Sequence, residues 1–152
     1  MLRIAAALHD IGKLHIPKNI RDKPGELEAR EYEVMKTHTK LGAAILSSIQ
    51  GEIGVMARTV CLHHHEWHDP AFGGYWGIPA HTLPGYVPIV SITDVLTALV
   101  SERSYKAAWK LEDALAFINK QAGTQFSAEL VDFFVPLIQS DNRVPAIFTE
   151  GS

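Results

Sequence analysis

The chain has 152 residues, of which 47% are hydrophobic and 20% charged, a balance that suits one globular domain and excludes low-complexity classes. Its 14 basic and 17 acidic side chains give a net charge of −3, so no excess of positive charge is available to neutralise a DNA or RNA backbone. The single cysteine cannot form an internal disulfide, and no apolar run reaches the roughly 18 residues that a membrane helix needs. We therefore expect a cytoplasmic protein that binds no nucleic-acid polymer and spans no membrane.

Apolar side chains recur at steps of three and four residues, which predicts helices over residues 2–10, 28–49, 52–65, 89–102, 111–122 and 128–139. Gly and Pro residues mark loops over 12–25 and 69–88. Ser127 is a favourable N-cap for the last helix, and Pro136 is expected to bend that helix or end it early. Strand-like alternation is not seen, so we predict an all-α fold of about five to seven helices. The expected domain covers residues 1–140, and residues 141–152 are expected to form a flexible tail.

Histidine is the residue type that stands out, because four of the eight histidines lie within residues 62–69. His38 and His64 each fall on the apolar stripe of a predicted helix, where a hydrogen-bonded core histidine is the alternative explanation for either residue alone. Asp94 lies in an otherwise apolar helix, where a buried carboxylate must be paired or bound. The alternative is a solvated carboxylate that interacts favourably with the helix dipole. A mixed set of imidazoles and carboxylates favours Fe, Mn or Zn over calcium. With the His9-Asp10 pair, which ends the first predicted helix and alone is weak evidence, and with His65 on the flank beside His64, the candidates are three or four histidines and two aspartates.

Three rival motifs do not fit the sequence. The segment His65-Glu66-Trp67-His68 is one residue short of the metalloprotease pattern H-E-x-x-H. Gly12-Lys13 is preceded five residues earlier by an alanine, so it is not a Walker phosphate-binding loop. Cys61 stands among apolar residues without a sign of activation, which predicts a buried, inert thiol.

Five segments, in consistent order, resemble the HD-GYP family of bacterial phosphodiesterases, which are metal-dependent members of the HD superfamily that hydrolyse cyclic di-GMP. The resemblance runs from Ala5 to Phe134. The segments are AALHDIGK (6–13), KPGELEAREYEVMKTH (23–38), LHHHE (62–66), SITDVLTALVSERSYKAAW (91–109) and AGTQFSAELV (122–131).

This resemblance implies an HD-superfamily helical bundle and a phosphodiesterase of bacterial signal transduction that converts cyclic di-GMP to pGpG or GMP. It implies two divalent transition metals, Fe or Mn, held by His9, Asp10, His38, His64, His65 and Asp94. Asp10 would bridge the metals, and Lys13 would lie beside the scissile phosphate. Arg103 and Lys106 would bind ligand phosphates, and Tyr75 would be the aromatic of the GYP loop. The implied partner is a cyclic dinucleotide; a homodimer or an upstream sensory domain is left open.

The sequence departs from the family pattern in three respects. The family's helix before the HD segment, with a further His or Glu ligand, is not among these residues, so one metal is expected to be held incompletely. The GYP motif reads Gly74-Tyr75-Trp76 after a lengthened spacer, and Pro88 and Thr97 replace a usual arginine and aspartate. Two alternatives therefore stay open: a degenerate sensor that binds metal or nucleotide without turnover, and an HD phosphohydrolase acting on another nucleotide.

Overall fold

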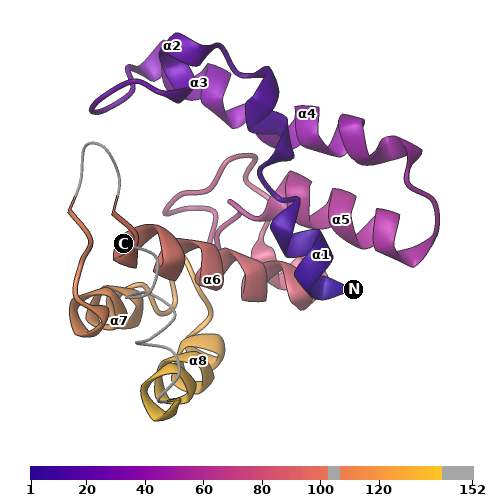
Figure 1. Ribbon diagram of the computed structural model, residues 1–152. Helices are drawn as coiled ribbons and strands as arrows, with labels where there is room; N and C mark the ends of the chain where they lie inside the picture. Colours follow the sequence, from indigo (N-terminus) through magenta and orange to yellow (C-terminus); the bar gives the residue numbers. More distant parts are fainter. Residues whose placement is uncertain (103–106, 142–152) are drawn as a thin grey trace. The chain divides into compact units, whose positions relative to one another are not determined.

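The computed structural model describes residues 1–102 and 107–141, which fall into two compact units. The N-terminal unit is Met1–His65, and the C-terminal unit begins at Glu66 (Figure 1). Within the described ranges the chain forms helices, turns and one isolated bridge between Ala122 and Phe126, with no strand. The predicted all-α class is therefore confirmed. In the same ranges, no helix combines the length and apolarity that a bilayer crossing requires.

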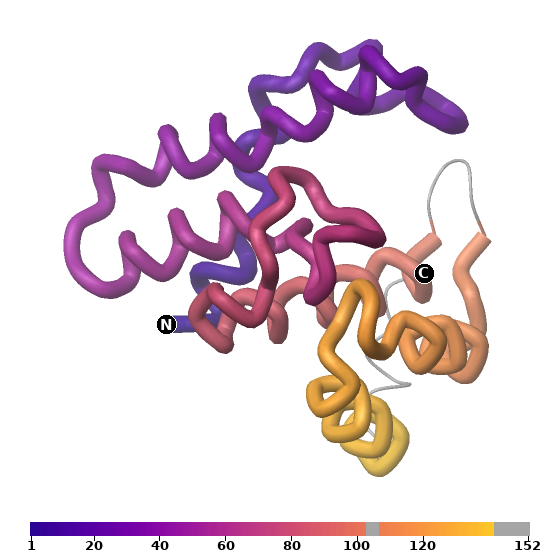
Figure 2. The backbone as a smooth tube through the Cα atoms, turned by 180° about the vertical axis from the view of Figure 1, so that it is seen from behind, coloured from indigo at the N-terminus to yellow at the C-terminus, as the bar shows by residue number. Residues whose placement is uncertain are grey.

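The N-terminal unit is built around an antiparallel pair of helices, α4 and α5, which lie side by side (Figures 1 and 2). Helix α1 packs against α5, and the 3₁₀ turn η1 packs against α4. This packing brings the turn after α1 close to the start of α4. The elements are α1 (Leu2–Ala7), η1 (Ile11–His15), α2 (Lys18–Arg21), α3 (Ala29–Lys36), α4 (His38–Ile45), η2 (Leu46–Ser48) and α5 (Gly51–His63).

Two sequence-based expectations for this unit are wrong in part. Residues 12–25 are not one loop, because they contain most of η1 and all of α2. The helix expected over 28–49 is divided at Thr37, whose hydroxyl donates to the Val34 carbonyl at 2.6 Å. The Thr37 backbone N–H also bonds to Val34, three residues back, and this tightened turn ends α3.

Glycine allows η1, α4 and α5 to approach each other closely. A Cβ added at Gly12 would lie 1.9 Å from the His38 carbonyl oxygen, and one added at Gly42 would lie 2.2 Å from the Cys61 sulfur. Neither distance is compatible with a side chain larger than hydrogen. Gly12 therefore fixes the separation between the Asp10 turn and the first residue of α4.

The C-terminal unit surrounds an apolar core in which α7 packs against both α6 and α8. Its elements are η3 (Ala80–Thr82), α6 (Tyr86–Val100), α7 (Leu111–Lys120) and α8 (Ala128–Ser140). The buried core side chains are Ile92, Leu96, Val100, Ala114, Leu115, Ile118, Phe126, Val131, Phe134 and Val135. The expected irregular loop is confirmed except for η3 and for its end, since α6 already begins before Pro88. Proline is tolerated there because a helix does not use the N–H groups of its first turn.

The last helix starts as predicted and ends later than predicted. Ser127 is its N-cap, with the hydroxyl accepting the Leu130 N–H at 3.1 Å. Pro136 does not end the helix early, because α8 continues to Ser140. Proline leaves the Asp132 carbonyl without its usual helical donor, but both residues are exposed, so water can satisfy that oxygen.

We predict that Gly12→Ala lowers the free energy of unfolding by about 1–3 kcal/mol, the usual cost of overpacking. The reason is that the added methyl group meets the His38 backbone. Gly85→Ala is the matched control, because a Cβ at Gly85 meets nothing within 4 Å. Urea unfolding measures both changes, and equal stability of the two variants would contradict the close packing.

Candidate metal centre

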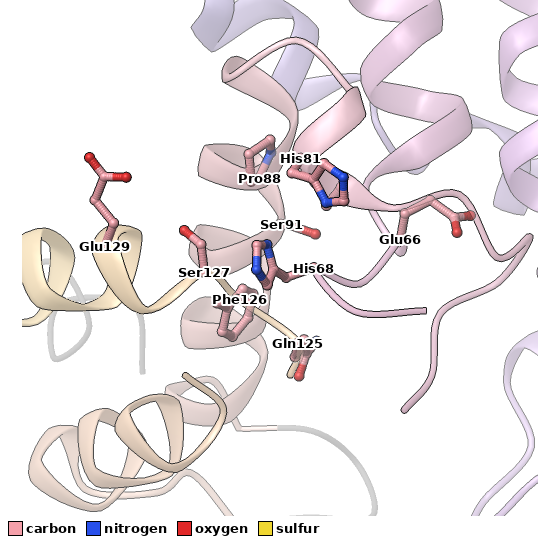
Figure 3. Close-up of a pocket in the computed structure, with 10 residues that line it drawn as sticks. Glu66, His68, His81, Pro88, Ser91, Gln125, Phe126, Ser127 and Glu129 are labelled. Carbon is pink, nitrogen blue, oxygen red and sulfur yellow. The ribbon is translucent and has the colours of Figure 1, made fainter. Parts of the chain in front are cut away.

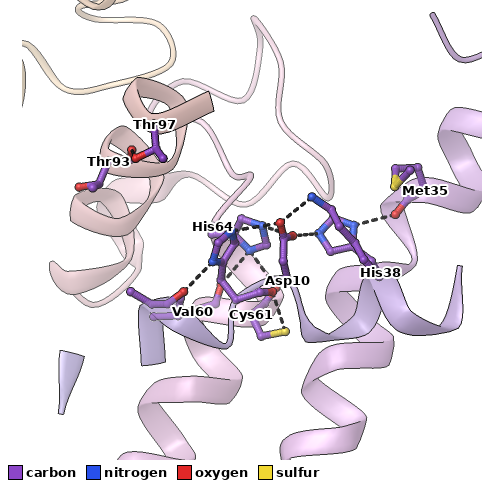
Figure 4. Close-up of polar contacts among 11 residues, drawn as sticks. Asp10, Met35, His38, Val60, Cys61, His64, Thr93 and Thr97 are labelled. Atoms are coloured by element: carbon purple, nitrogen blue, oxygen red, sulfur yellow. Dashed lines mark hydrogen bonds and ion pairs between the residues drawn. The ribbon is translucent and has the colours of Figure 1, made fainter. Parts of the chain in front are cut away.

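Four predicted ligands from three segments of the N-terminal unit meet at one point. Figure 4 shows three of them, with Asp10 between His38 and His64. Asp10 lies in the turn after α1, His38 is the first residue of α4, and His64 and His65 follow the end of α5. Each offers a ligand atom, and these atoms lie within 4.8 Å of one another. His38 and His64 are buried, with 0% and 1% of their surfaces exposed. The structure therefore brings together candidate metal ligands that lie far apart in the sequence, since His64 follows Asp10 by 54 positions.

The carboxylate of Asp10 is the centre of this cluster. Its Oδ1 lies 3.2 Å from Nε2 of His38 and 3.7 Å from Nε2 of His64. Its Oδ2 lies 3.2 Å from Nε2 of His9. His65 contributes at the edge, with its ring centroid 4.0 Å from that of His64 and 5.3 Å from that of His38. Each imidazole near the carboxylate thus presents the same ring atom to it.

The opposite ring nitrogen of three histidines is fixed by backbone carbonyls. Nδ1 of His9 lies 2.6 Å from the Ala6 oxygen, and Nδ1 of His38 lies 2.7 Å from the Met35 oxygen. Nδ1 of His64 lies 3.1 Å from the carbonyl oxygens of both Val60 and Cys61. A carbonyl oxygen only accepts hydrogen bonds, so Nδ1 carries the proton in each ring. In a neutral imidazole, Nε2 then has a lone pair, which is the tautomer that metal-binding histidines use.

These lone pairs face carboxylate oxygens, and this arrangement requires cations between them. One option is a proton on every ring, but three imidazolium ions in one buried cluster would repel each other at high cost. A divalent metal satisfies the carboxylate and several Nε2 atoms at once. The donor chemistry therefore fits a divalent-metal site, and the backbone carbonyls on Nδ1 hold the rings as second-sphere partners do in such sites.

Electrostatics keep Asp10 ionised. Burial alone would raise the pKa of this carboxyl group, but the charge of Lys13, together with hydrogen bonds from His38 and His9 when those rings carry a proton on Nε2, holds the pKa well below its ordinary value. Nζ of Lys13 donates to Oδ2 of Asp10 at 2.5 Å. Asp10 is therefore a carboxylate at any pH near neutral, the form that can bind a metal ion.

Cys61 supports the cluster in a way that the sequence did not reveal. Its thiol is fully buried and donates to the His9 carbonyl oxygen at 3.1 Å. Burial, with a smaller contribution from the charge of Asp10, raises the pKa of the thiol to about 11. The thiol thus stays protonated and inert, as expected, and it ties the His9–Asp10 turn to α5. The one available signal was its spacing, three residues before His64 on the same helix.

The remaining predicted site residues stay predictions. Asp94 is half-buried on α6, and Tyr75 is half-buried in the loop before it, both in the C-terminal unit. Arg103 and Lys106 lie outside the described residues. Lys13 is placed against Asp10, and its approach to a phosphate is untested.

The C-terminal unit contains a cavity of about 210 Å³ that sequence reasoning did not anticipate (Figure 3). His68, His81 and the buried Ser91 contribute to its wall, together with Phe126 and the first turn of α8. The rings of His68 and His81 meet edge to face, with centroids 5.8 Å apart. No predicted site residue lines this cavity, but Glu66, the residue after the histidine cluster, does.

Comparison with known proteins connects this cluster to a family. Residues 1–130 match the HD domain family. The cyclic di-GMP phosphodiesterase response regulator RpfG of Xanthomonas campestris is 38% identical over 133 residues, which is 87% of this chain and 35% of that protein. A cyclic di-GMP phosphodiesterase of Thermotoga maritima is 39% identical over 137 residues, 90% of this chain and 37% of that protein.

A third relative carries a different substrate in its name. The 3'3'-cGAMP-specific phosphodiesterase 2 of Vibrio cholerae is 34% identical over 136 residues, 89% of this chain and 26% of that protein. The chain thus spans between about a quarter and a little more than a third of the length of these relatives. The family match covers the Asp10 turn and all the candidate ligand histidines, and the comparisons confirm the predicted resemblance to the HD-GYP phosphodiesterases. On the family match and the assembled ligand cluster together, the chain belongs to the HD domain family.

Proposed function

We propose that this chain is a phosphodiesterase domain that hydrolyses cyclic di-GMP in bacterial second-messenger signalling. The observation that carries the proposal is the half-buried Asp10 carboxylate, which is faced by Nε2 atoms of the buried His38 and His64, whose Nδ1 atoms are fixed by backbone carbonyls. The names of the relatives, two of which are cyclic di-GMP phosphodiesterases, support the choice of substrate. A cytoplasmic location is part of the proposal.

The metals of this proposal are two divalent ions, Fe or Mn. The mixture of imidazole and carboxylate ligands favours Fe, Mn or Zn, and the resemblance to the HD-GYP family implies two ions and favours Fe or Mn. Such ions, when bound, make water a usable nucleophile at neutral pH and offset charge on the phosphoryl group. Asp10, His38, His64 and His65 would hold them, with His9 beside Asp10 and Asp94 as a further ligand.

Residues of the chain perform the other tasks. Lys13 keeps Asp10 ionised and oriented, and its ammonium would offset charge that develops on the phosphate. Arg103 suits bidentate phosphate contact, whereas Lys106 would act as a point charge. Tyr75 or Trp76 would stack on a guanine base.

We predict that His38→Ala lowers the affinity for Mn²⁺ by more than about tenfold. The substitution removes a buried candidate ligand, and the loss of a residue that only orients a metal ligand already costs about tenfold or more. Calorimetric titration of the metal-free protein measures the affinity. Elemental analysis of the wild type should find between roughly one metal per two chains and two per chain. His15→Ala is the control, since His15 is exposed at the end of η1. Equal affinities in the two variants would contradict the assignment.

We predict that Asp10→Ala abolishes hydrolysis of cyclic di-GMP by the metal-loaded protein, because Asp10 is the carboxylate that would hold the metals on which activation of water depends. Chromatography of the products measures turnover. Asp22→Ala, which removes a carboxylate paired only with its neighbour Arg21 in the described contacts, should leave turnover unchanged.

The same assay separates the alternatives. If the metal-loaded wild type binds the nucleotide tightly but forms no product, the protein is a sensor rather than an enzyme. Faster turnover of 3'3'-cGAMP than of cyclic di-GMP would reassign the substrate to that of the third relative.

A further inference from the structure

Glu66 is a buried carboxylate that directly follows His65, the last histidine of the candidate metal centre, and it has no role in the proposed chemistry. Only 3% of its surface is exposed. Its Oε1 accepts the backbone N–H of Trp76 at 2.9 Å, and its Oε2 accepts the N–H groups of Trp76 and Ile78 at 3.2 and 3.0 Å. Figure 3 shows the carboxylate turned away from His68 and Ser91, which line the cavity.

These three bonds join a buried side chain to the backbone of the loop that follows it. A buried carboxyl group is costly unless it is hydrogen-bonded, and the two backbone N–H groups supply donors to both of its oxygens. The neighbouring Trp67 carbonyl accepts the Ala80 N–H at 2.9 Å, which closes the base of the same loop. Residues 69–79, which we call the aromatic loop, are therefore tied at their base and at their centre.

Two glycines let the aromatic loop come this close to Glu66 and Trp67. A Cβ on Gly73 would lie 2.8 Å from the indole ring of Trp67. Gly74 has φ +102°, and a Cβ there would lie 3.1 Å from the Trp67 nitrogen and 3.4 Å from Oε2 of Glu66. The loop thus combines a buried anchor with backbone positions that only glycine fits.

The aromatic loop presents flat side chains that suit nucleobases. Phe72 is 63% exposed, and Tyr75 and Trp76 are half-buried. A base that stacks on an aromatic side chain gains about 1–3 kcal/mol, and this gain depends on where the ring is held. Because Glu66 binds the backbone of Trp76 itself, it determines where these rings lie.

We propose that Glu66 is a positioning residue whose carboxylate holds the aromatic loop in the shape that stacks on the bases of the cyclic dinucleotide. The inference rests on the proposed function, because it concerns binding of that substrate. Glu66 does not touch the phosphates or the metals in this proposal, so its removal should weaken nucleotide binding and leave metal binding unchanged.

The direction in which Glu66→Gln changes the affinity for the nucleotide distinguishes a positioning role from a purely electrostatic one. The ligand carries two negative phosphodiesters, so a nearby carboxylate repels it, and neutralising that carboxylate would tighten binding if charge alone mattered. Glu66→Gln keeps the shape of the side chain but turns one acceptor oxygen into a donor that faces backbone N–H groups. The positioning role therefore predicts weaker binding from the same substitution.

The test compares Glu66→Gln with Glu129→Gln, which removes an exposed carboxylate in the first turn of α8. Glu66→Gln should raise the Kd for cyclic di-GMP about tenfold, in line with one lost stacking contact. It should also speed amide hydrogen exchange at Trp76 and Ile78. The Mn²⁺ affinity and the turnover of bis(p-nitrophenyl) phosphate, a phosphodiester without nucleobases, should stay at wild-type values. Glu129→Gln should change none of these quantities.

A second variant approaches the same contact from the loop. Gly74→Ala should reproduce the weaker nucleotide binding, because its methyl group pushes against the Trp67 nitrogen and Glu66. Gly77→Ala is its control: Gly77 also has a positive φ, of +73°, but a Cβ there meets nothing within 4 Å. This pair decides the question if Glu66→Gln does not fold.

Unchanged or tighter binding of cyclic di-GMP by folded Glu66→Gln would overturn the inference, as would unchanged exchange at Trp76 and Ile78. A wild-type protein that binds no cyclic dinucleotide would instead overturn the proposed function, and with it the ligand part of this inference. In that case, faster exchange in Glu66→Gln would still establish that the carboxylate holds the aromatic loop.

Discussion

The Asp10 carboxylate and the imidazole Nε2 atoms that face it place the strictest demands on the N-terminal unit. Oxygen and nitrogen lone pairs 3.2 Å apart repel unless cations lie between them, so the surrounding structure must hold the groups together. Backbone carbonyls on Nδ1 fix the rings, and the charge of Lys13 stabilises the carboxylate. The arrangement resembles a preorganised metal site, in which the side chains of the ligands are already ordered when the protein folds. Little of the free energy of metal binding is then spent on ordering them.

The close approach of the segments explains several features that have no polar chemistry of their own. Gly12 and Gly42 occupy positions where a methyl group would strike the His38 backbone or the Cys61 sulfur. The Cys61 thiol joins α5 to the turn that carries His9 and Asp10. Substitutions at these positions would displace ligand atoms without removing a ligand, and a metal site that tolerates only small displacements would lose affinity.

The sequence supported the prediction of the helices and of the inward placement of His38 and His64, because both follow from apolar periodicity. The other members of the cluster were assigned by the family resemblance. His38 and His64 were placed inward by the stripes of Met35, Leu41, Val60 and Met56, and both are buried. The break at Thr37 and the η1 turn were missed, since each depends on local hydrogen bonds that compete with a continuous helix or loop. The roles of Gly12, Cys61 and Glu66 could not be predicted from periodicity, because their partners lie on other segments of the chain.

Metal-edge X-ray absorption of the Mn²⁺-loaded protein tests the central claim most directly, because it reports the atoms bound to the ion. The account predicts scattering from imidazole rings together with carboxylate oxygen, and a loss of part of the imidazole signal in His38→Ala. An ion surrounded by oxygen alone, or an imidazole signal that His38→Ala leaves intact, would contradict the claim that these histidines converge on a metal.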